Sequence, residues 1–496
     1  MRFFGGSPGQ VRASHTSREN VPDHGVIHSR PGCGIYVHIG GPGAIHPRPP
    51  PALIRNQQES MQRALSFSNS PPLGVPLRFL INTPLFVLLA ALLLLWAGPS
   101  ALGSRWTGHA LALTHLFTLG VLASAMLGAM MQILPVATGI RMPAPRLTAA
   151  VTHLLLTSGT LSLAAGFLTV HPLFFRLAIP LLGGAFAWLL VAGFCGLWRD
   201  RRQATKGSAE ILVATRLALA ALLVTVVMGL LLAAGFVWPV PVSRLFTDLH
   251  SAWGLLGWVG LLVMGMSYQV IPMFQVTELY PKTLTRWLAI VVFVLLLALA
   301  ANMLRDPLGG IEIGYTLAIL LLLAYGAYAY ATFRLLWTRK RPEADTTTRF
   351  WHTAVFSLGA CFPVWLAQII TGADLAVTLG VLFIVGFAWS AVNGMLYKIL
   401  PFLLWYNAQR DLDVALREVP KVKQILPDDV ALPQYWVHLA AVAALVAASL
   451  WPAALARPAG LLLAASALWL GVNMARALLF YRRALKNIAR ALASRA

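Results

Sequence analysis

The chain has 496 residues, of which 58% are hydrophobic and only 11% are charged. A soluble globular protein carries about 25% charged residues, so this composition excludes a soluble domain and indicates a polytopic membrane protein. The formal net charge of +21 would suit a nucleic-acid-binding protein, but the basic residues stand in short segments between apolar runs, as membrane topology requires. We therefore expect a lipid bilayer as partner and no nucleic acid.

Residues 1–76 differ from the rest of the chain. They are rich in Gly, Pro, Ser, Arg and His and show no apolar periodicity, which is typical of a disordered segment. A metal-binding tail is an alternative reading, because the segment holds the histidines His15, His24, His28, His38 and His46. Met61 opens a stretch that leads directly into the first apolar run, so we expect that residues before it result from a mis-called start.

Twelve apolar runs follow, each near the length of about 20 residues that a helix needs to cross a bilayer. They lie at 79–98, 108–137, 147–170, 172–198, 209–238, 245–275, 284–304, 311–337, 350–372, 374–405, 434–452 and 458–481. The least distinct boundary is the one between the third and fourth runs, at the sequence VHPLFF. The pattern predicts an all-α protein with twelve transmembrane helices.

The loops predict the orientation of these helices. Basic residues gather after the even-numbered runs and in the C-terminal tail, for example in RDRR at 199–202 and RKR at 339–341. The loops after odd-numbered runs hold single arginines, such as Arg105 and Arg457. Because positive charge favours the cytoplasmic side, we expect both termini in the cytoplasm and the chain in the inner membrane of a bacterium.

A phrase near the ends of three of these runs repeats. The windows TLGVLASAMLGAMMQILP (118–135), LLGWVGLLVMGMSYQVIP (255–272) and IVGFAWSAVNGMLYKILP (384–401) align without a gap. Small residues let membrane helices approach closely and proline closes a helix, so one match alone would mean little. Three matches at spacings of 137 and 129 residues predict three parallel units of four helices, at about 77–206, 207–345 and 346–485, with a basic tail at 486–496.

Twelve helices in three parallel units of four, with both termini inside, resemble the subunit I fold of the haem–copper oxidases. The stretch GHALALTHLFTLGVLASAMLGAMMQILPVATG also resembles divergent members of that superfamily, the haem- and copper-containing membrane proteins linked to the nitric oxide response. The resemblance implies a histidine near the outer end of the second helix as a haem ligand and one near the outer end of the sixth helix as a copper ligand. His115 and His250 match these two positions.

The chain also departs from the family pattern. The seventh and tenth runs contain no histidine, although the family places histidines there, so the usual copper site is incomplete. No Asp or Glu stands deep in a run, and a proton-pumping pathway normally needs buried ionisable groups. These departures argue against an oxygen-reducing proton pump.

Histidine suits haem iron and copper because its neutral ring offers a nitrogen ligand. His115 is the candidate haem ligand, His109 is a second candidate on the same run, and His250 is a candidate ligand for copper or haem. At 100° per residue, His115 points roughly 160–200° away from the face that carries the other two, so we expect His115 and His250 to face different cavities. Interfacial hydrogen bonding without a ligand is the alternative for each.

Two functions remain open. The first is a divergent, haem–copper oxidase-like protein that binds haem, with copper as a further candidate, and serves redox, nitric-oxide or metal-handling chemistry with a redox partner or a small gaseous ligand. The second is a metal-free transporter or accessory protein that keeps the fold. The sequence leaves open whether the protein is an enzyme.

Overall fold

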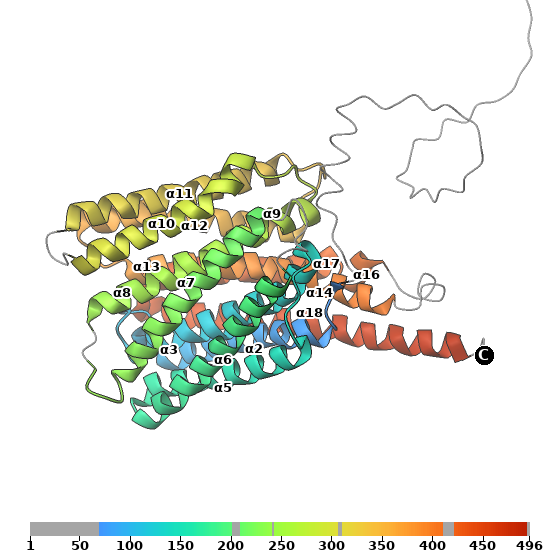
Figure 1. Cartoon of the computed structure of the whole chain (residues 1–496), viewed down its shortest axis with the longest axis horizontal. Coiled ribbons are helices and arrows are strands. Elements are labelled where there is room, and N and C mark those ends of the chain that lie inside the picture. The colour runs from blue at the N-terminus through green and yellow to red at the C-terminus, as the bar shows by residue number, and fades with distance from the viewer. Residues whose placement is uncertain (1–68, 201–208, 241–242, 306–309, 410–420, 494–496) are drawn as a thin grey trace, which may run out of the picture. The chain divides into compact units, whose positions relative to one another are not determined.

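The computed structural model describes residues 69–200, 209–240, 243–305, 310–409 and 421–493. The predicted start at Met61 and most of the predicted N-terminal tail lie outside these residues, as do residues 494–496. Every secondary-structure element in the described part of the chain is a helix, which confirms the all-α prediction (Figure 1). The predicted tail at 486–496 belongs, as far as Ala493, to the last helix.

The elements of the first half are α2 (Gly74–Ala97), η2 (Gly98–Ala101), α3 (Gly108–His115), η3 (Leu116–Ala123), α4 (Ser124–Thr138), α5 (Pro145–Thr169), α6 (Pro172–Arg199) and α7 (Ala209–Ala234). Those of the second half are α8 (Arg244–Ala252), η4 (Trp253–Gly260), α9 (Leu261–Gln275), α10 (Lys282–Arg305), α11 (Ile311–Trp337), α12 (Thr346–Thr371), α13 (Ala376–Val381), η5 (Leu382–Trp389), α14 (Ser390–Ala408), α16 (Val422–Ile425), α17 (Asp428–Leu450) and α18 (Pro452–Ala493). Within the described ranges they form 12 helical runs long and apolar enough to cross a membrane, and these coincide with the twelve predicted spans.

The boundary between the third and fourth spans falls where the sequence placed it. Val170 ends α5 in the left-handed conformation, at φ 54°. The ring of His171 then accepts a hydrogen bond from the Leu173 N–H, and Pro172 occupies the first position of α6, where its missing N–H costs no hydrogen bond. His171 is therefore a helix cap at a turn, in the loop where the sequence predicted it.

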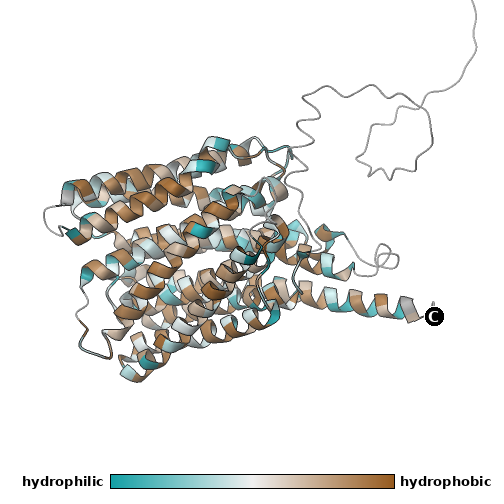
Figure 2. Cartoon of the chain, in the orientation of Figure 1, coloured by the Kyte–Doolittle hydropathy of each residue, from teal (hydrophilic) through white to brown (hydrophobic). Residues whose placement is uncertain are grey.

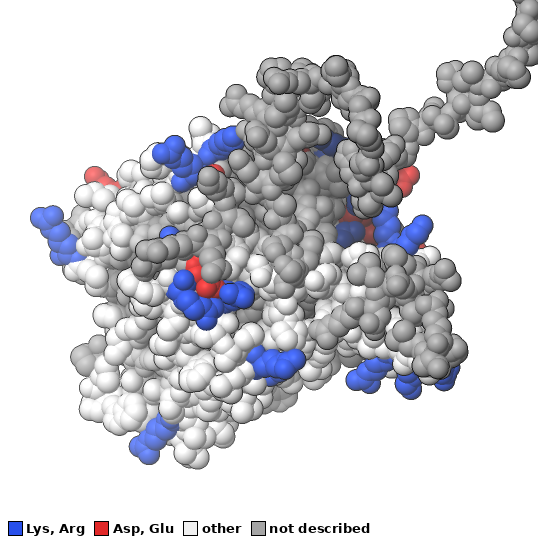
Figure 3. All heavy atoms as spheres, turned by 45° about the vertical axis from the view of Figure 1, so that its right-hand side comes forward, with Lys and Arg blue, Asp and Glu red and all other residues white. Residues whose placement is uncertain are grey.

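The surface agrees with a multi-pass membrane protein. Hydrophobic residues dominate the outward faces of the helices (Figure 2), and large apolar side chains such as Trp198, Trp337 and Leu154 are more than 60% exposed. Lys and Arg side chains form small separate groups around broad uncharged surface (Figure 3). In water such a surface would be unfavourable, whereas lipid chains solvate it.

Three composite spans pack together at the centre of the bundle. They are α3–η3–α4, α8–η4–α9 and α13–η5–α14, and both η3 and η4 contact η5. Residues of α4, α9 and α14, with Leu80 of α2 and Trp351 of α12, line an apolar pocket of about 70 Å³. The three helices α4, α9 and α14 contribute residues at equivalent positions, counted from the repeated glycine Gly128, Gly265 or Gly394. These residues stand three and two positions before the glycine and one and five positions after it.

The repeated glycines let these spans approach the first helix of the same predicted unit. A Cβ atom added at Gly128, Gly265 or Gly394 would lie 2.5–2.8 Å from a Cβ atom of a neighbouring helix. The neighbours are Phe79 of α2, Ala214 of α7 and Phe350 of α12. The upstream glycines Gly120, Gly257 and Gly386 pack in the same way against residues seven positions further along the same three helices, namely Phe86, Ala221 and Ser357.

Each composite span contains eight residues of π-helix, and all three segments start four residues before Gly120, Gly257 or Gly386. Such wide turns are rare, and they are frequent at functional sites because they rotate the faces of the helix on either side. His115 directly precedes η3, and His250 lies three residues before η4.

The outer helices follow one contact pattern. The third and fourth helices of each predicted unit pack together, as α5 with α6, α10 with α11 and α17 with α18. The fourth helix then contacts the first helix of the following unit, as α6 with α7 and α11 with α12, and α18 closes the ring against α2. We name the end from which α18 extends past the bundle the basic end (Figure 1). Arg141, Arg199 and Arg339 lie there, at loops that follow even-numbered spans.

Candidate functional site: a histidine pair near one end of the bundle

His115 and His250 lie together, although 135 positions separate them in sequence. Their ring centroids are 6.2 Å apart and their ring planes differ by 20°. The expectation that they face different cavities is therefore wrong. Counting 100° per residue placed the two histidines on opposite faces of two equivalent helices. When such helices are neighbours in a ring, one face of the first helix points toward the opposite face of the second, so the two side chains can meet.

Both rings are oriented by the same kind of bond. His115 Nδ1 lies 2.8 Å from the carbonyl oxygen of Leu111, one turn earlier in α3. His250 Nδ1 lies 3.0 Å from the carbonyl oxygen of Thr225, in α7. A carbonyl can only accept, so each Nδ1 carries the proton and each Nε2 keeps its lone pair. Neither Nε2 has a hydrogen-bond partner among the described residues, so both are available to a metal.

The surroundings of the pair are apolar and aromatic. The His115 ring lies 5.3 Å from the ring of Phe167, which in turn contacts Phe175 and Phe236. On the other side, a Cβ atom at Gly229 would lie 2.9 Å from His250 Cε1, so only glycine leaves room for this ring. Helices α3, α5, α6, α7 and α8 or their adjoining loops thus contribute to the site.

A polar cluster covers the end of the bundle near the pair. Arg105, in the loop before α3, forms an ion pair of 2.7 Å with Asp248, two residues before His250. The guanidinium groups of Arg105 and Arg244 lie 4.2 and 5.5 Å from the ring centre of Trp106. These contacts tie the start of the second span to the start of the sixth, and thereby hold the two histidines together.

His109 does not belong to the pair. Its Nδ1 lies 3.2 Å from the Ser100 hydroxyl, and its ring packs edge-on against Trp96 at 5.4 Å. The structure therefore separates the two histidines of the second span, with His115 at the pair and His109 beside α2.

The chemistry open to this site is limited by its ligands. Within the described residues there is no group of three or more His, Cys, Asp or Glu side chains placed to hold a metal ion. Two neutral imidazoles could supply two ligands to a haem iron or to a copper ion, but they cannot build a closed four-ligand zinc site.

Other side chains that could carry chemistry lie away from the pair. His438 is fully buried, with its Nε2 2.8 Å from the Ser390 hydroxyl. Tyr325 and Tyr328 are also buried, whereas Tyr330 of the same helix is exposed. The Tyr325 hydroxyl donates a hydrogen bond to the carbonyl of Leu256.

The buried tyrosines extend to the basic end. The Tyr280 hydroxyl lies 2.9 Å from the Thr332 hydroxyl, and its ring lies near those of Tyr268 and Tyr328. Burial raises the pKa of the Tyr280 phenol well above its ordinary value, so this group stays protonated and its hydrogen bond to Thr332 is structural.

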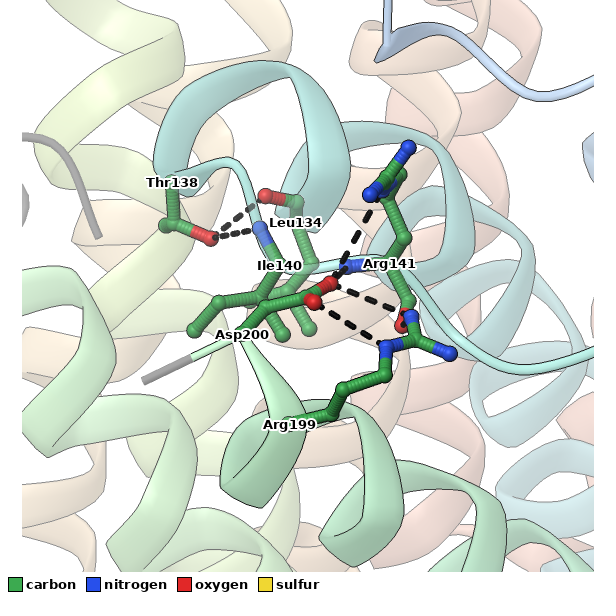
Figure 4. Close-up of polar contacts among 6 residues, drawn as sticks. All are labelled: Leu134, Thr138, Ile140, Arg141, Arg199 and Asp200. Carbon is green, nitrogen blue, oxygen red and sulfur yellow. Dashed lines mark hydrogen bonds and ion pairs between the residues drawn. The ribbon is translucent and has the colours of Figure 1, made fainter. Parts of the chain in front are cut away.

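Asp200 organises another part of the basic end (Figure 4). Its carboxylate accepts hydrogen bonds from the Arg141 N–H at 2.9 Å and from the Arg199 side chain at 3.0 and 3.1 Å. These bonds, led by that from Arg199, hold the pKa of Asp200 below its ordinary value. A cavity of about 560 Å³ lies beside this cluster. Both arginines already interact with one carboxylate, so we interpret the cluster as a clamp between α4 and α6.

Comparison with protein-family models gives no match to this chain, and comparison with curated proteins gives none either. The function is therefore argued from the residues and their geometry.

Proposed function

We propose that this protein is a divergent membrane protein of the haem–copper oxidase subunit I type, in which His115 and His250 together bind one redox group. The proposed group is haem, and a copper ion is the second candidate. The protein would serve redox, nitric-oxide or metal-handling chemistry in the inner membrane of a bacterium, with both termini in the cytoplasm.

The architecture supports this proposal through its repeated register. The three π-helical segments, the two sets of glycine contacts and the lining of the apolar pocket all recur at the same positions of the 118–135, 255–272 and 384–401 windows. The contacts among outer helices recur with the same order. Three parallel four-helix units explain all of these observations at once.

The observation that carries the functional proposal is the pairing of the two histidines. Two imidazole rings that share one metal, at about 2.0 Å from each nitrogen, have centroids roughly 6 Å apart. The observed separation is 6.2 Å with ring planes that differ by 20°, and neither Nε2 has a hydrogen-bond partner among the described residues. This proximity of two unpaired Nε2 atoms supports the proposal that both histidines would serve one metal.

The residues around the pair have distinct tasks in this proposal. The carbonyls of Leu111 and Thr225 fix the orientation of the rings, and hydrogen bonding at Nδ1 makes each Nε2 a stronger ligand. Phe167 and its aromatic neighbours exclude water from one side. A haem bound there would supply a metal that cycles between two oxidation states.

The test is the visible spectrum and metal content of the purified protein. We expect a Soret band, or bound copper, that is lost in both His115→Ala and His250→Ala and kept in His109→Ala, which removes a histidine of the same span outside the pair. A protein without colour and without metal would instead support the alternative, a transporter or accessory protein that keeps the fold. The missing histidines of the seventh and tenth spans favour that alternative.

A further inference from the structure

The interface of α14 with α17 and α18 is polar, although it lies inside a membrane domain. On α14 the polar residues are Ser390, Asn393 and Tyr397, which stand at i, i+3 and i+7 and therefore share one face of the helix. Asn393 and Ser390 are fully buried and Tyr397 is 5% exposed. Polar side chains at such depth are costly and usually functional.

The helices that face α14 also carry buried polar residues. Gln434 and His438 of α17 and Ser466 and Asn473 of α18 are all buried. We call these four residues, together with the three of α14, the polar seam.

Hydrogen bonds connect most of the seam. The Tyr397 hydroxyl donates to Gln434 Oε1 at 3.3 Å and accepts from Asn473 Nδ2 at 3.0 Å. Gln434 Nε2 donates to the Ser466 hydroxyl at 3.0 Å. One turn deeper, His438 Nε2 lies 2.8 Å from the Ser390 hydroxyl.

Asn393 stands between these two groups of bonds and joins neither. Its Oδ1 and Nδ2 both lack a partner among the described residues, as do His438 Nδ1 and Asn473 Oδ1. Unpaired polar atoms at this depth are unfavourable unless a small polar ligand completes them. The first unit has Leu127 and the second has Met264 at the register of Asn393, so the fold itself does not need an amide at this position.

The seam leads toward the basic end. Lys398, which follows Tyr397, forms an ion pair of 2.8 Å with Asp345, and Asn473 Nδ2 also donates to the Val430 carbonyl in the first turn of α17. His438 lies ten residues after the start of α17, which is about 15 Å along the helix axis. Toward the opposite end of the bundle, the same span consists of the apolar segment η5, which ends at Trp389, directly before Ser390.

We propose that the polar seam is a hydrated path that admits water from the basic end of the bundle as far as His438. Water is the ligand that these groups suit, because they offer both donors and acceptors and carry no formal charge that would select an ion. The path would let protons exchange between that side of the membrane and the buried imidazole. This inference is independent of any group bound at His115 and His250.

Cysteine accessibility tests the path, with a matched control in the repeat. In a full-length chain whose Cys33, Cys195 and Cys361 are replaced by serine, Asn393→Cys is compared with Leu127→Cys, its counterpart in the first unit. A small, charged, membrane-impermeant thiol reagent is added to sealed vesicles from the side of the basic end. We expect position 393 to react at least about tenfold faster than position 127, because the reactive thiolate forms only where water reaches it. Equal, negligible rates at the two positions would overturn the proposal.

A second variant keeps the test valid if a cysteine variant does not fold. Asn393→Leu installs the residue of the first unit. In a hydrated seam this change displaces water from His438 and Asn473, so we expect an unchanged or lower resistance to unfolding in detergent. A clear gain in resistance would show that Asn393 was a dry, unpaired amide, and would refute the path.

Discussion

The contact between Gly265 and Ala214 allows a sharp test of the packing at the centre of the bundle. A Cβ atom at position 265 would lie 2.6 Å from the Cβ atom of Ala214. Carbon atoms in contact normally stand about 3.5–4.0 Å apart, so α9 and α7 would have to separate by about 1 Å. Ala214 has no rotatable side chain with which to avoid the clash.

Gly265→Ala should therefore lower the free energy of unfolding. Overpacking of a tight interface costs about 1–3 kcal/mol. Part of this loss is hidden, because alanine is intrinsically better than glycine in a helix by about 1 kcal/mol. Gly326→Ala corrects for that gain, since Gly326 is exposed within α11 and a Cβ atom there would have nothing within 4 Å. We expect the two variants to differ by about 1–3 kcal/mol, with Gly265→Ala the less stable.

Unfolding in mixed micelles with increasing dodecyl sulfate, followed by circular dichroism, measures this difference. The double variant Gly265→Ala with Ala214→Gly restores the space, so its loss should be smaller than the sum of the two single losses. Equal stability of Gly265→Ala and Gly326→Ala, or strictly additive losses in the double variant, would refute the proposed close contact.

Three further outcomes are expected. Gly229→Ala should displace the His250 ring and weaken binding of the proposed redox group about 10–100-fold, because changes to groups that orient a metal ligand commonly have this effect. Titration of the apoprotein with haem or copper would measure the change. Burial raises the pKa of Asp345, but its ion pair with Lys398 and its hydrogen bonds from Thr348 outweigh this and lower it. The stability advantage of wild type over Asp345→Asn should therefore stay constant from about pH 8 to 5 and shrink below about pH 4, which thermal unfolding across pH would show. Lys398→Met should remove most of that advantage at neutral pH; an unchanged advantage would contradict the ion pair.

Much of the fold was predictable because the bilayer imposes length and polarity on each span. All twelve spans, including the break at His171, follow from apolar length and from cap residues such as Pro172. The π-helical segments were not predictable, since LFTLGVLA, WGLLGWVG and LFIVGFAW share only the glycine at their fifth position, and a glycine in a membrane helix more often indicates close packing than a wide turn.

The site was predicted only in part. The resemblance to the haem–copper oxidase fold implied His115 and His250, because they stand near the outer ends of the second and sixth spans, but a calculation on isolated helices could not tell that the two rings lie close together. The role of Gly229 depends on a contact between α7 and α8 and has no local signal. The polar seam was missed because its residues come from three spans, although the i, i+3, i+7 spacing of Ser390, Asn393 and Tyr397 is visible in the sequence.

The central claim, that His115 and His250 share one bound group, is tested most directly by a cryo-electron microscopy map of the protein purified without added chelator. The account predicts strong density between the two rings, within about 2 Å of each Nε2, the usual distance from a metal to an imidazole nitrogen. Two well-ordered rings with only water-like density between them, or rings turned so that their Nε2 atoms bond to protein groups, would contradict it.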